Sequence, residues 1–244
     1  MAKDELYTGF WVDFYDKLFP AYIYPKTFKI IHKLIKKHNP NAKNVLELAC
    51  GTGRYVEQFA KAGFIVKGID SSQDVLKKAK KRIKKAKFEL KDMQNIKEKS
   101  ESYDVVVCLF ESFRYIKNYL NCEKVMNNVW KALKPKGLFI VDFGHWPPTK
   151  ETKIHNKVKM NGLTIVKDEI IRTKGIYDTR FDMVKIYKKG KIETKEIKRS
   201  PLLRISKNKM KEMLLKTKFK ILEIIVSFRG HPQSMLFVAQ KKGK

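Results

Sequence analysis

The segment from Val45 to Gly53, which reads VLELACGTG, constrains the fold of this chain more than any other. A short apolar run leads directly into a turn with glycines at alternate positions, Gly51 and Gly53. Such a run is typical of a buried strand, and glycine lets the following backbone approach a ligand closely. In open α/β sheets, ligands bind at the carboxyl ends of the strands. The segment therefore predicts an α/β fold with a ligand site at this turn.

Strand and helix patterns alternate over much of the chain. We expect strands at 45–49, 64–69, 88–90, 103–110 and 138–143, and helices at 26–38, 55–62, 72–86 and 123–133. Alternation of this kind predicts parallel strands covered by helices on both faces. A helix at 207–216 and strands at 219–228 and 235–240 complete the pattern. The predicted fold class is α/β: a doubly wound, mostly parallel, seven-stranded sheet of the Rossmann-like type.

A different pattern occupies residues 153–205. This stretch contains short runs rich in Ile, Val, Thr and Tyr, with hairpin signals at Asn161-Gly162 and Lys189-Gly190. It predicts a small antiparallel β insertion.

The glycine spacing excludes one large class of ligand site. Dinucleotide-binding folds carry Gly-x-Gly-x-x-Gly at this turn. Here Val56 stands where the third glycine would be. A pyrophosphate bound at the helix N-terminus is therefore disfavoured, and we expect a ligand without phosphate.

Candidate ligand-binding residues recur where the other predicted strands end. Asp70 ends the second strand and is suited to accept the hydroxyls of a ribose. Asp92 and Met93 follow the third strand, where Asp92 can accept a hydrogen bond from an adenine amine. Leu109 and Phe110 end the fourth strand, where the aminoacyl end of a ligand would lie.

These residues, from Val45 to Phe143, resemble the class I S-adenosylmethionine-dependent methyltransferases. The resemblance implies a Rossmann-like methyltransferase fold that binds S-adenosyl-L-methionine and releases S-adenosyl-L-homocysteine. It also implies that Glu47 to Gly53 cradle the methionine part, Asp70 the ribose, and Asp92 with Met93 the adenine. The cofactor-binding residues expected on this basis are Tyr15, Glu47, Ala49, Gly51, Gly53, Asp70, Ser71, Asp92, Met93, Leu109 and Phe110.

A narrower resemblance points to small-molecule N-methyltransferases. The segments 49–53, 92–93 and 110–116 and the late β insertion are similar to the TDP-aminosugar N,N-dimethyltransferases, and less closely to glycine N-methyltransferases. Phe14-Tyr15-Asp16 matches a Tyr-Asp pair whose tyrosine lies over the cofactor in that group. Glu111 departs from the small polar residue of the aminosugar enzymes.

The resemblance implies one domain over 1–244. We expect an N-terminal helical lid (1–40), a cofactor-binding core (41–149), an antiparallel β insertion over the acceptor pocket (150–205), and a closing helix with two strands (206–244).

Methyl transfer to an amine benefits from a group that orients the amine or takes its proton. The catalytic candidates are Tyr15, Glu111 and His145. Each also has a structural reading: Tyr15 can pack the N-terminal helix, and Glu111 can cap a helix or pair with Arg114. We expect no metal, because the sequence shows no metal-ligand spacing.

The net charge of +29 leaves a second acceptor class open. A basic surface suits an RNA or protein substrate. However, only eight of the 54 basic residues are Arg, and Lys also serves as an ordinary solvating residue. We therefore expect a small-molecule acceptor, with an RNA or protein methyltransferase as the alternative, and a binding module without activity as a third.

Location and assembly follow from what the sequence lacks. No apolar run has the length of a membrane span, and the N-terminus lacks the pattern of a secretory signal. An odd number of cysteines, three, argues against a disulfide framework. We expect a cytoplasmic protein that is a monomer or homodimer, without membrane contact.

Overall fold

The computed structural model describes residues 4–19 and 21–243, so Pro20, residues 1–3 and residue 244 of the predicted lid and closing segment lie outside it. The chain divides into two compact units. We call Tyr22–Trp146 with Ile205–Lys244 the core unit, and Met1–Ala21 with Pro147–Arg204 the insertion unit. The division falls between Ala21 and Tyr22, inside the N-terminal span 1–40 that the sequence predicts as one segment.

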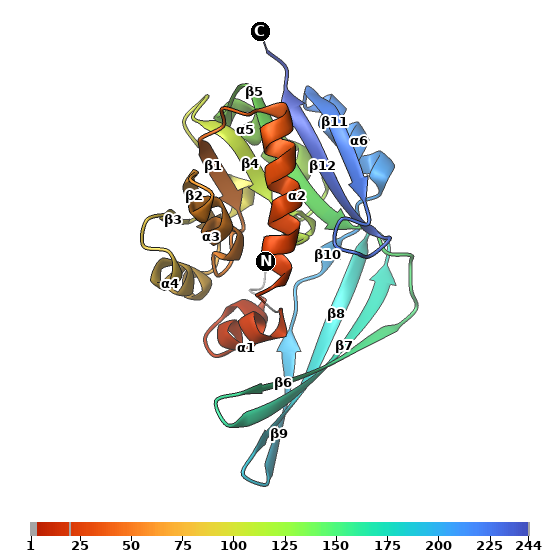
Figure 1. The fold of residues 1–244 in the computed structure, drawn as a ribbon. Coiled ribbons are helices and arrows are strands. Elements are labelled where there is room, and N and C mark those ends of the chain that lie inside the picture. Colours follow the sequence, from red (N-terminus) through yellow and green to blue (C-terminus); the bar gives the residue numbers. More distant parts are fainter. Residues whose placement is uncertain (1–3, 20, 244) are drawn as a thin grey trace. The chain divides into compact units, whose positions relative to one another are not determined.

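A seven-stranded sheet forms the centre of the core unit, in the order β11-β12-β5-β4-β1-β2-β3. In this sheet β12 runs antiparallel to both of its neighbours, β11 and β5, and the other described pairings are parallel. The predicted doubly wound α/β fold is therefore confirmed (Figure 1). The strands are β1 (Asn44–Leu48), β2 (Ile65–Asp70), β3 (Lys87–Leu90), β4 (Tyr103–Cys108), β5 (Leu133–Gly144), β11 (Phe219–Val226) and β12 (Ser234–Lys241).

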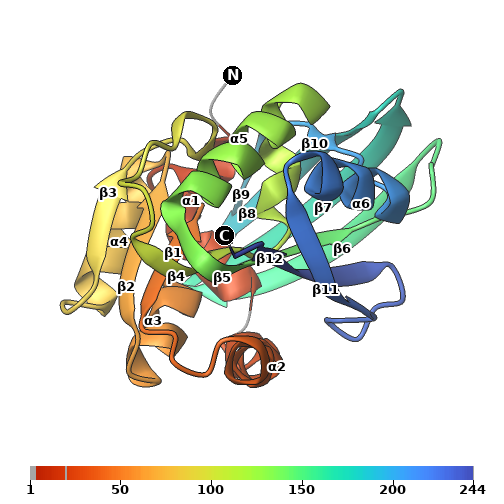
Figure 2. The ribbon, with the colours of Figure 1, turned by 90° about the horizontal axis from the view of Figure 1, so that it is seen from above.

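Helices cover both faces of this sheet. The helices α2 (Ile23–His38) and α3 (Arg54–Lys61) lie on one face, and α5 (Tyr119–Ala132) and α6 (Lys207–Lys216) on the other (Figure 2). The helix α4 (Gln73–Arg82) connects β2 to β3. In α2, Ile31 and Ile35 are four residues apart and fully buried, which explains the apolar spacing seen in the sequence. The helix begins earlier than predicted, because Pro25 is tolerated in the first turn.

Among the predicted boundaries that are wrong, two lie beside the candidate site. The helix expected to reach residue 86 ends at Arg82, because Ile83 takes an extended conformation. The strand expected to reach residue 110 ends at Cys108, because Phe110 and Glu111 both adopt left-handed backbone conformations.

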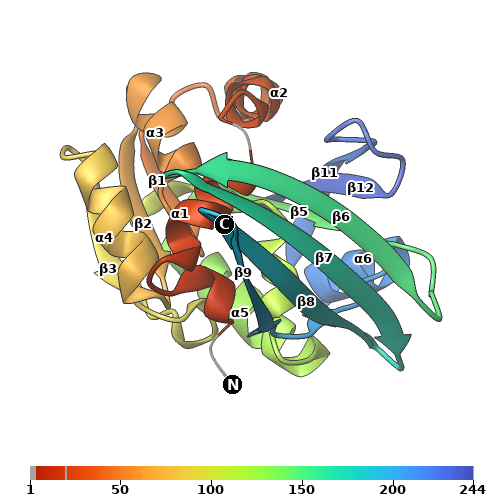
Figure 3. The same cartoon turned by 90° about the horizontal axis from the view of Figure 1, so that it is seen from below.

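The insertion unit contains an antiparallel five-stranded sheet. Its order is β10-β8-β7-β6, and β9 pairs with β8. The neighbouring long strands are visible in Figure 3. The strands are β6 (Thr152–Met160), β7 (Leu163–Lys174), β8 (Tyr177–Lys188), β9 (Lys191–Lys198) and β10 (Leu202–Leu203). The predicted hairpin turns at Asn161-Gly162 and Lys189-Gly190 connect β6 to β7 and β8 to β9.

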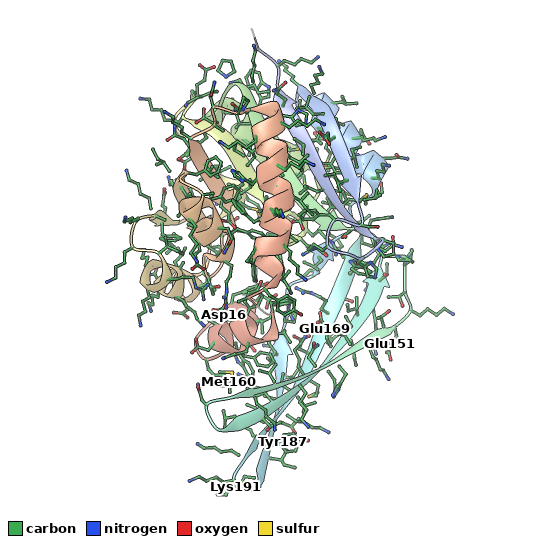
Figure 4. The ribbon with its side chains drawn as sticks, in the orientation of Figure 1. Asp16, Glu151, Met160, Glu169, Tyr187 and Lys191 are labelled. Atoms are coloured by element: carbon green, nitrogen blue, oxygen red, sulfur yellow. The ribbon has the colours of Figure 1, made fainter. Side chains whose placement is uncertain are left out.

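The N-terminal residues pack on this same sheet. The helix α1 (Trp11–Leu18) follows a short 3₁₀ turn, Glu5–Tyr7. Trp11 and Phe14 of α1 share an apolar cluster with Met160 and Ile165, and Met160 is labelled beside α1 in Figure 4.

Buried charges add to the packing of the insertion unit. Lys167 is 1% exposed and forms ion pairs with Glu169 and Asp182. Asp182 also pairs with Arg199, which in turn pairs with Asp4 near the N-terminus. Pairing of this kind offsets the cost of burying these charges.

Candidate active site

The turn after β1 consists of alternating left-handed residues. Ala49, Gly51 and Gly53 have φ angles of 52°, 54° and 78°. A Cβ atom on Gly53 would lie 2.8 Å from Ile83 Cδ1, so glycine lets α4 pack closely against the turn. A Cβ atom on Gly51 would meet no heavy atom of the described residues within 4 Å. Gly51 therefore borders open space on the side where a ligand would approach.

Arg82 fixes this turn from the end of α4. Its Nη1 donates to Thr52 O at 2.7 Å and to Thr52 Oγ1 at 3.1 Å. In the sequence, Arg82 belongs to a basic run that is most simply interpreted as a solvated helix face. In the structure, Arg82 instead hydrogen-bonds the turn after β1, a role that the basic run does not reveal.

Asp70 links the ends of β1 and β2. Asp70 Oδ2 accepts from Gly51 N at 2.9 Å, and Asp70 Oδ1 accepts from Ser72 N at 2.9 Å. The backbone of Ser71 also hydrogen-bonds this carboxylate, while the Ser71 side chain is exposed. Burial raises the pKa of Asp70, and the nearby Asp92 raises it further. Each carboxylate oxygen can accept about two hydrogen bonds, so Asp70 keeps acceptor capacity for a ligand hydroxyl.

Glu47 lies beneath the turn in the middle of the sheet. It is 3% exposed, and no donor within residues 4–19 and 21–243 hydrogen-bonds its Oε2. Burial raises the pKa of Glu47 well above its usual value, and the negative charge of Asp70 adds to the effect. A buried carboxylate oxygen without a donor is costly, and a bound ligand that supplies a donor or a positive charge would relieve that cost.

Asp92 and Met93 lie just after β3, as predicted. Asp92 Oδ1 accepts from Gln94 N at 2.8 Å and begins the short 3₁₀ helix η2 (Met93–Asn95). Met93 is buried, with its sulfur 4.0 Å from Cys108 Sγ at the end of β4.

Leu109 and Phe110 follow β4. Leu109 is buried, and Phe110 has a φ of 62°. The Phe110 ring stacks on Tyr24 of α2 at 5.6 Å, and the Arg229 guanidinium lies 5.0 Å from the ring centroid. The residue after the strand is therefore fixed by an aromatic and a cationic neighbour.

Glu111 is held by two arginines. Its Oε2 pairs with Arg114 Nη1 and its Oε1 with Arg229 Nη2, both at 2.7 Å. Burial raises the pKa of Glu111, but the guanidinium groups of Arg229 and Arg114 outweigh it, so the pKa lies below its ordinary value. The predicted pairing with Arg114 is present. An ionised, doubly paired carboxylate is a weak base, which favours an orienting role for Glu111 over proton transfer.

His145 follows β5 immediately. Its backbone N–H donates to Gln233 O at 3.0 Å, and the side chain is half-buried. The next residue, Trp146, packs against His231 with ring centroids 4.2 Å apart. A Cβ atom on Gly144 would lie 2.4 Å from Trp146 Nε1, so glycine at the end of β5 admits the indole.

Tyr15 belongs to the insertion unit. Its ring packs edge-on against Tyr7 at 5.3 Å and near Phe19 at 4.8 Å. It also borders the apolar cluster beneath α1. Its expected position over the cofactor stays a prediction.

Two residues near Glu111 were missed by sequence reasoning. Asp142 lies in β5 and is 1% exposed, and Arg229 lies between β11 and β12. Asp142 could have been found from the sequence, because an acidic residue inside the apolar run 138–143 is unusual. Arg229 carries no comparable signal, because its partners are distant in sequence.

No helix within 4–19 and 21–243 is long and apolar enough to cross a membrane. In the same residues, no group of three or more His, Cys, Asp or Glu side chains is arranged to hold a metal ion.

Part of the core unit is similar to a family of known proteins. The methyltransferase domain family matches residues 45–137. The chain is 29% identical to the dTDP-3-amino-3,4,6-trideoxy-alpha-D-glucopyranose N,N-dimethyltransferase of Streptomyces venezuelae, over 49% of this chain and 50% of that protein. It is 30% identical to a glycine/sarcosine N-methyltransferase of Aphanothece halophytica, over 45% of this chain and 43% of that protein. The chain thus spans about half the length of the curated relatives it matches.

The fold resembles solved structures over nearly its full length. The sugar N-methyltransferase KedS8 from Streptoalloteichus superposes with a TM-score of 0.83, at 15% identity, over 99% of this chain and 96% of that one. This likeness confirms the Rossmann-like fold with its antiparallel insertion.

Proposed function

We propose that this chain, whose residues 45–137 match the methyltransferase domain family, transfers a methyl group from S-adenosylmethionine to an amine nitrogen of a small molecule. The proposal combines the family of the core segment, the charges at the carboxyl edge of the sheet, and the substrates named for the relatives.

The observation that carries the proposal is a row of carboxylates around the turn after β1. The charge of Asp70 raises the pKa of Glu47, and the charge of Asp92 raises that of Asp70. An acidic edge repels phosphates but attracts a cation. S-adenosylmethionine carries an ammonium and a sulfonium and lacks phosphate. The buried Glu47 Oε2 without a donor fits such a ligand.

The predicted cofactor residues divide by position along this edge. We assign the methionine part to Glu47, Ala49, Gly51 and Gly53, with Leu109 and Phe110 at its far end. We assign the ribose to Asp70 and Ser71. We assign the adenine to Asp92 and Met93, because a polar side chain there lies beside a buried apolar one.

The bound cofactor would supply a methyl group already activated by its sulfonium. The transfer forms an N–C bond, breaks the C–S bond, and leaves a proton on the methylated amine to be released. Holding the two reacting groups in line accounts for most of the rate in such reactions. We propose that Glu111 attracts and orients the amine, and that Tyr15 and His145 are candidates for taking the proton.

The acceptor class is inferred from the relatives. The proteins named above act, by their names, on an amino sugar and on glycine or sarcosine. Both contain an amine on a small polar molecule. We propose an acceptor of that chemistry, without choosing between sugar and amino acid.

Isothermal titration calorimetry with S-adenosylhomocysteine tests the cofactor assignment. We expect the wild type to bind and Asp70→Ala to bind at least about tenfold more weakly, because a charged hydrogen-bond partner is lost. No binding by the wild type, or equal binding by Asp70→Ala, would refute the assignment. Labelled methyl transfer to a panel of amines, acids and RNA then tests the acceptor.

One observation keeps a polyanionic acceptor as a second candidate. Phe181, Met183 and Tyr187 alternate along β8 and are exposed. Lys185 lies on the same face, and Lys157 and Lys198 lie on that face of β6 and β9 by strand register. Exposed aromatic rings among lysines suit single-stranded RNA. Binding to a labelled oligoribonucleotide that falls steeply with salt, and is lost in Phe181→Ala/Tyr187→Ala, would favour this candidate.

We further propose that the protein works in the cytoplasm, as a monomer or homodimer. Cys50, Cys108 and Cys122 are free and buried, as in proteins of reducing compartments.

A further inference from the structure

The turn after β4 contains two consecutive strained residues. Phe110 and Glu111 have φ angles of 62° and 61°. Non-glycine residues in this region are strained and persist only where neighbouring groups hold them. What holds this turn therefore decides where Leu109 and Phe110 stand in the site.

Asp142 binds the turn from the adjacent strand. Its Oδ1 accepts from Glu111 N at 3.2 Å, and the backbone N–H of Phe110 also hydrogen-bonds its carboxylate. Both amides of the strained turn thus end on one buried carboxylate. Asp142 Oδ2 has no hydrogen-bond donor in the described chain, and Arg229 Nε stands 3.4 Å from it.

Arg229 binds the same turn from the segment between β11 and β12. One guanidinium nitrogen pairs with Glu111 Oε1, while the group as a whole lies over the Phe110 ring. Arg229 therefore contacts both strained residues and also the carboxylate that binds their amides. Three separate segments of the chain meet at this turn.

We propose that Asp142 and Arg229 act together as positioning residues, which hold the Phe110–Glu111 turn in the conformation that the cofactor's aminoacyl end requires. This proposal rests on the proposed function. It assigns a role in ligand binding to two residues that are not among the predicted cofactor-binding residues. Neither is placed in contact with the cofactor or the acceptor.

The charge balance around Asp142 gives the proposal a measurable signature. Burial raises the pKa of Asp142 to about 6, against the opposing effect of Arg229. Glu111 from the turn raises it as well, and Tyr55 of α3 and Cys108 of β4 also sense its charge. Protonation of Asp142 would remove the charged acceptor for the two amides and the partner of Arg229 Nε.

Affinity for S-adenosylhomocysteine tests the proposal in Asp142→Asn, Asp142→Leu and Arg229→Gln. We expect about a tenfold loss in the Asn and Gln variants, from weakened charged hydrogen bonds. The Leu variant should lose more, because it cannot accept the amides at all. If Asp142 acts through hydrogen bonds, Asp142→Asn should bind S-adenosylhomocysteine more tightly than Asp142→Leu, because Asn can still accept the amides.

Asp104→Asn is the matched control. Asp104 lies in the same strand as Cys108 but at its start, accepts from Lys43 N and Asn44 N, and pairs with Lys134. Like Asp142, it accepts hydrogen bonds from two backbone N–H groups, but at the opposite end of the parallel strands. Thermal unfolding identifies any variant that fails to fold. If the Asp142 variants fail to fold, Arg229→Gln still tests the proposal, because it changes a loop residue.

The outcomes separate the two proposals. If the wild type does not bind, the proposed function fails. If the wild type binds and the folded Asp142 and Arg229 variants bind equally well, or if Asp104→Asn loses as much affinity as Asp142→Asn, the positioning role is overturned. We also expect wild-type affinity to fall more than that of Asp142→Asn between pH 7 and pH 5; parallel profiles would contradict the proposal.

Discussion

Arg82, the last residue of α4, donates hydrogen bonds to both oxygens of Thr52 in the turn that follows β1. The helix thereby fixes the turn at the point where the backbone passes between two left-handed glycines. This contact couples a helix on the outside of the sheet to the proposed cofactor site.

Replacing Arg82 should therefore weaken cofactor binding without changing the fold. For Arg82→Gln we expect about a three- to tenfold loss of affinity for S-adenosylhomocysteine, since two hydrogen bonds that order the turn are lost. Lys80→Gln, an exposed change of the same charge on the same helix, is the control for net charge. Equal effects of the two changes in calorimetry would show that only charge matters.

Gly53→Ala should destabilise the protein more than Gly63→Ala. Both glycines have left-handed φ angles, 78° and 87°, so both changes introduce backbone strain. Only at position 53 does the new methyl group also collide with Ile83 and Ala79. We expect losses of about 2–4 kcal/mol at 53 and about 1 kcal/mol at 63, measured by urea unfolding. Equal losses would mean that α4 moves away at little cost.

The free energy of unfolding should fall as the pH rises and Asp142 ionises. Its pKa in the folded protein is about 6, above the ordinary value of 3.8, so the unfolded chain ionises first. Stability from the neutral form is complete below the ordinary value and is lost as the pH passes 6. The wild type should lose about 2–3 kcal/mol relative to Asp142→Asn between pH 4 and pH 7. Urea unfolding of both proteins across this range measures the difference, and a constant difference would contradict the expectation.

Lys167→Met should unfold the insertion unit at lower temperature. The change removes the cation between two carboxylates, one of them fully buried, and such losses cost about 3–5 kcal/mol. Lys185→Met, at an exposed position of the neighbouring strand, serves as the control. Calorimetric unfolding should show a large shift for the first and little for the second; similar shifts would show that the buried pairs contribute little.

The alternation of strands and helices was readable from the sequence because each element carries its own apolar pattern. The core helix α6 and the hairpin turns of the insertion fell at their predicted places for this reason. The ends of β4 and α4 did not, because they depend on groups from elsewhere in the chain. Asp142 and Arg229 hold the turn after β4, and Gly53 receives Ile83 after α4.

The candidate site divides along the same line. Glu47 and Asp70 lie at the ends of β1 and β2, and Asp92 and Phe110 come just after β3 and β4, so their positions were predictable from local pattern and topology. Arg229 was not, because its charge is one of 54 in the sequence and nothing local distinguishes it. Glu111 was predicted as a substrate group, and only the structure reveals its second arginine.

The pairing of Asp4 with Arg199 has a consequence for how the chain folds during synthesis. These residues are separated by 195 positions, and Arg180, the other arginine that pairs with Asp4, is 176 positions away, so neither ion pair can form until most of the described residues have been synthesised. Long-range contacts of this kind form late and slowly. The parallel strands β1 to β5 can assemble while α1 still lacks the sheet on which it packs. Until that sheet is made, α1 presents Trp11 and Phe14 without the residues that bury them, and this apolar surface is one that a holding chaperone could protect.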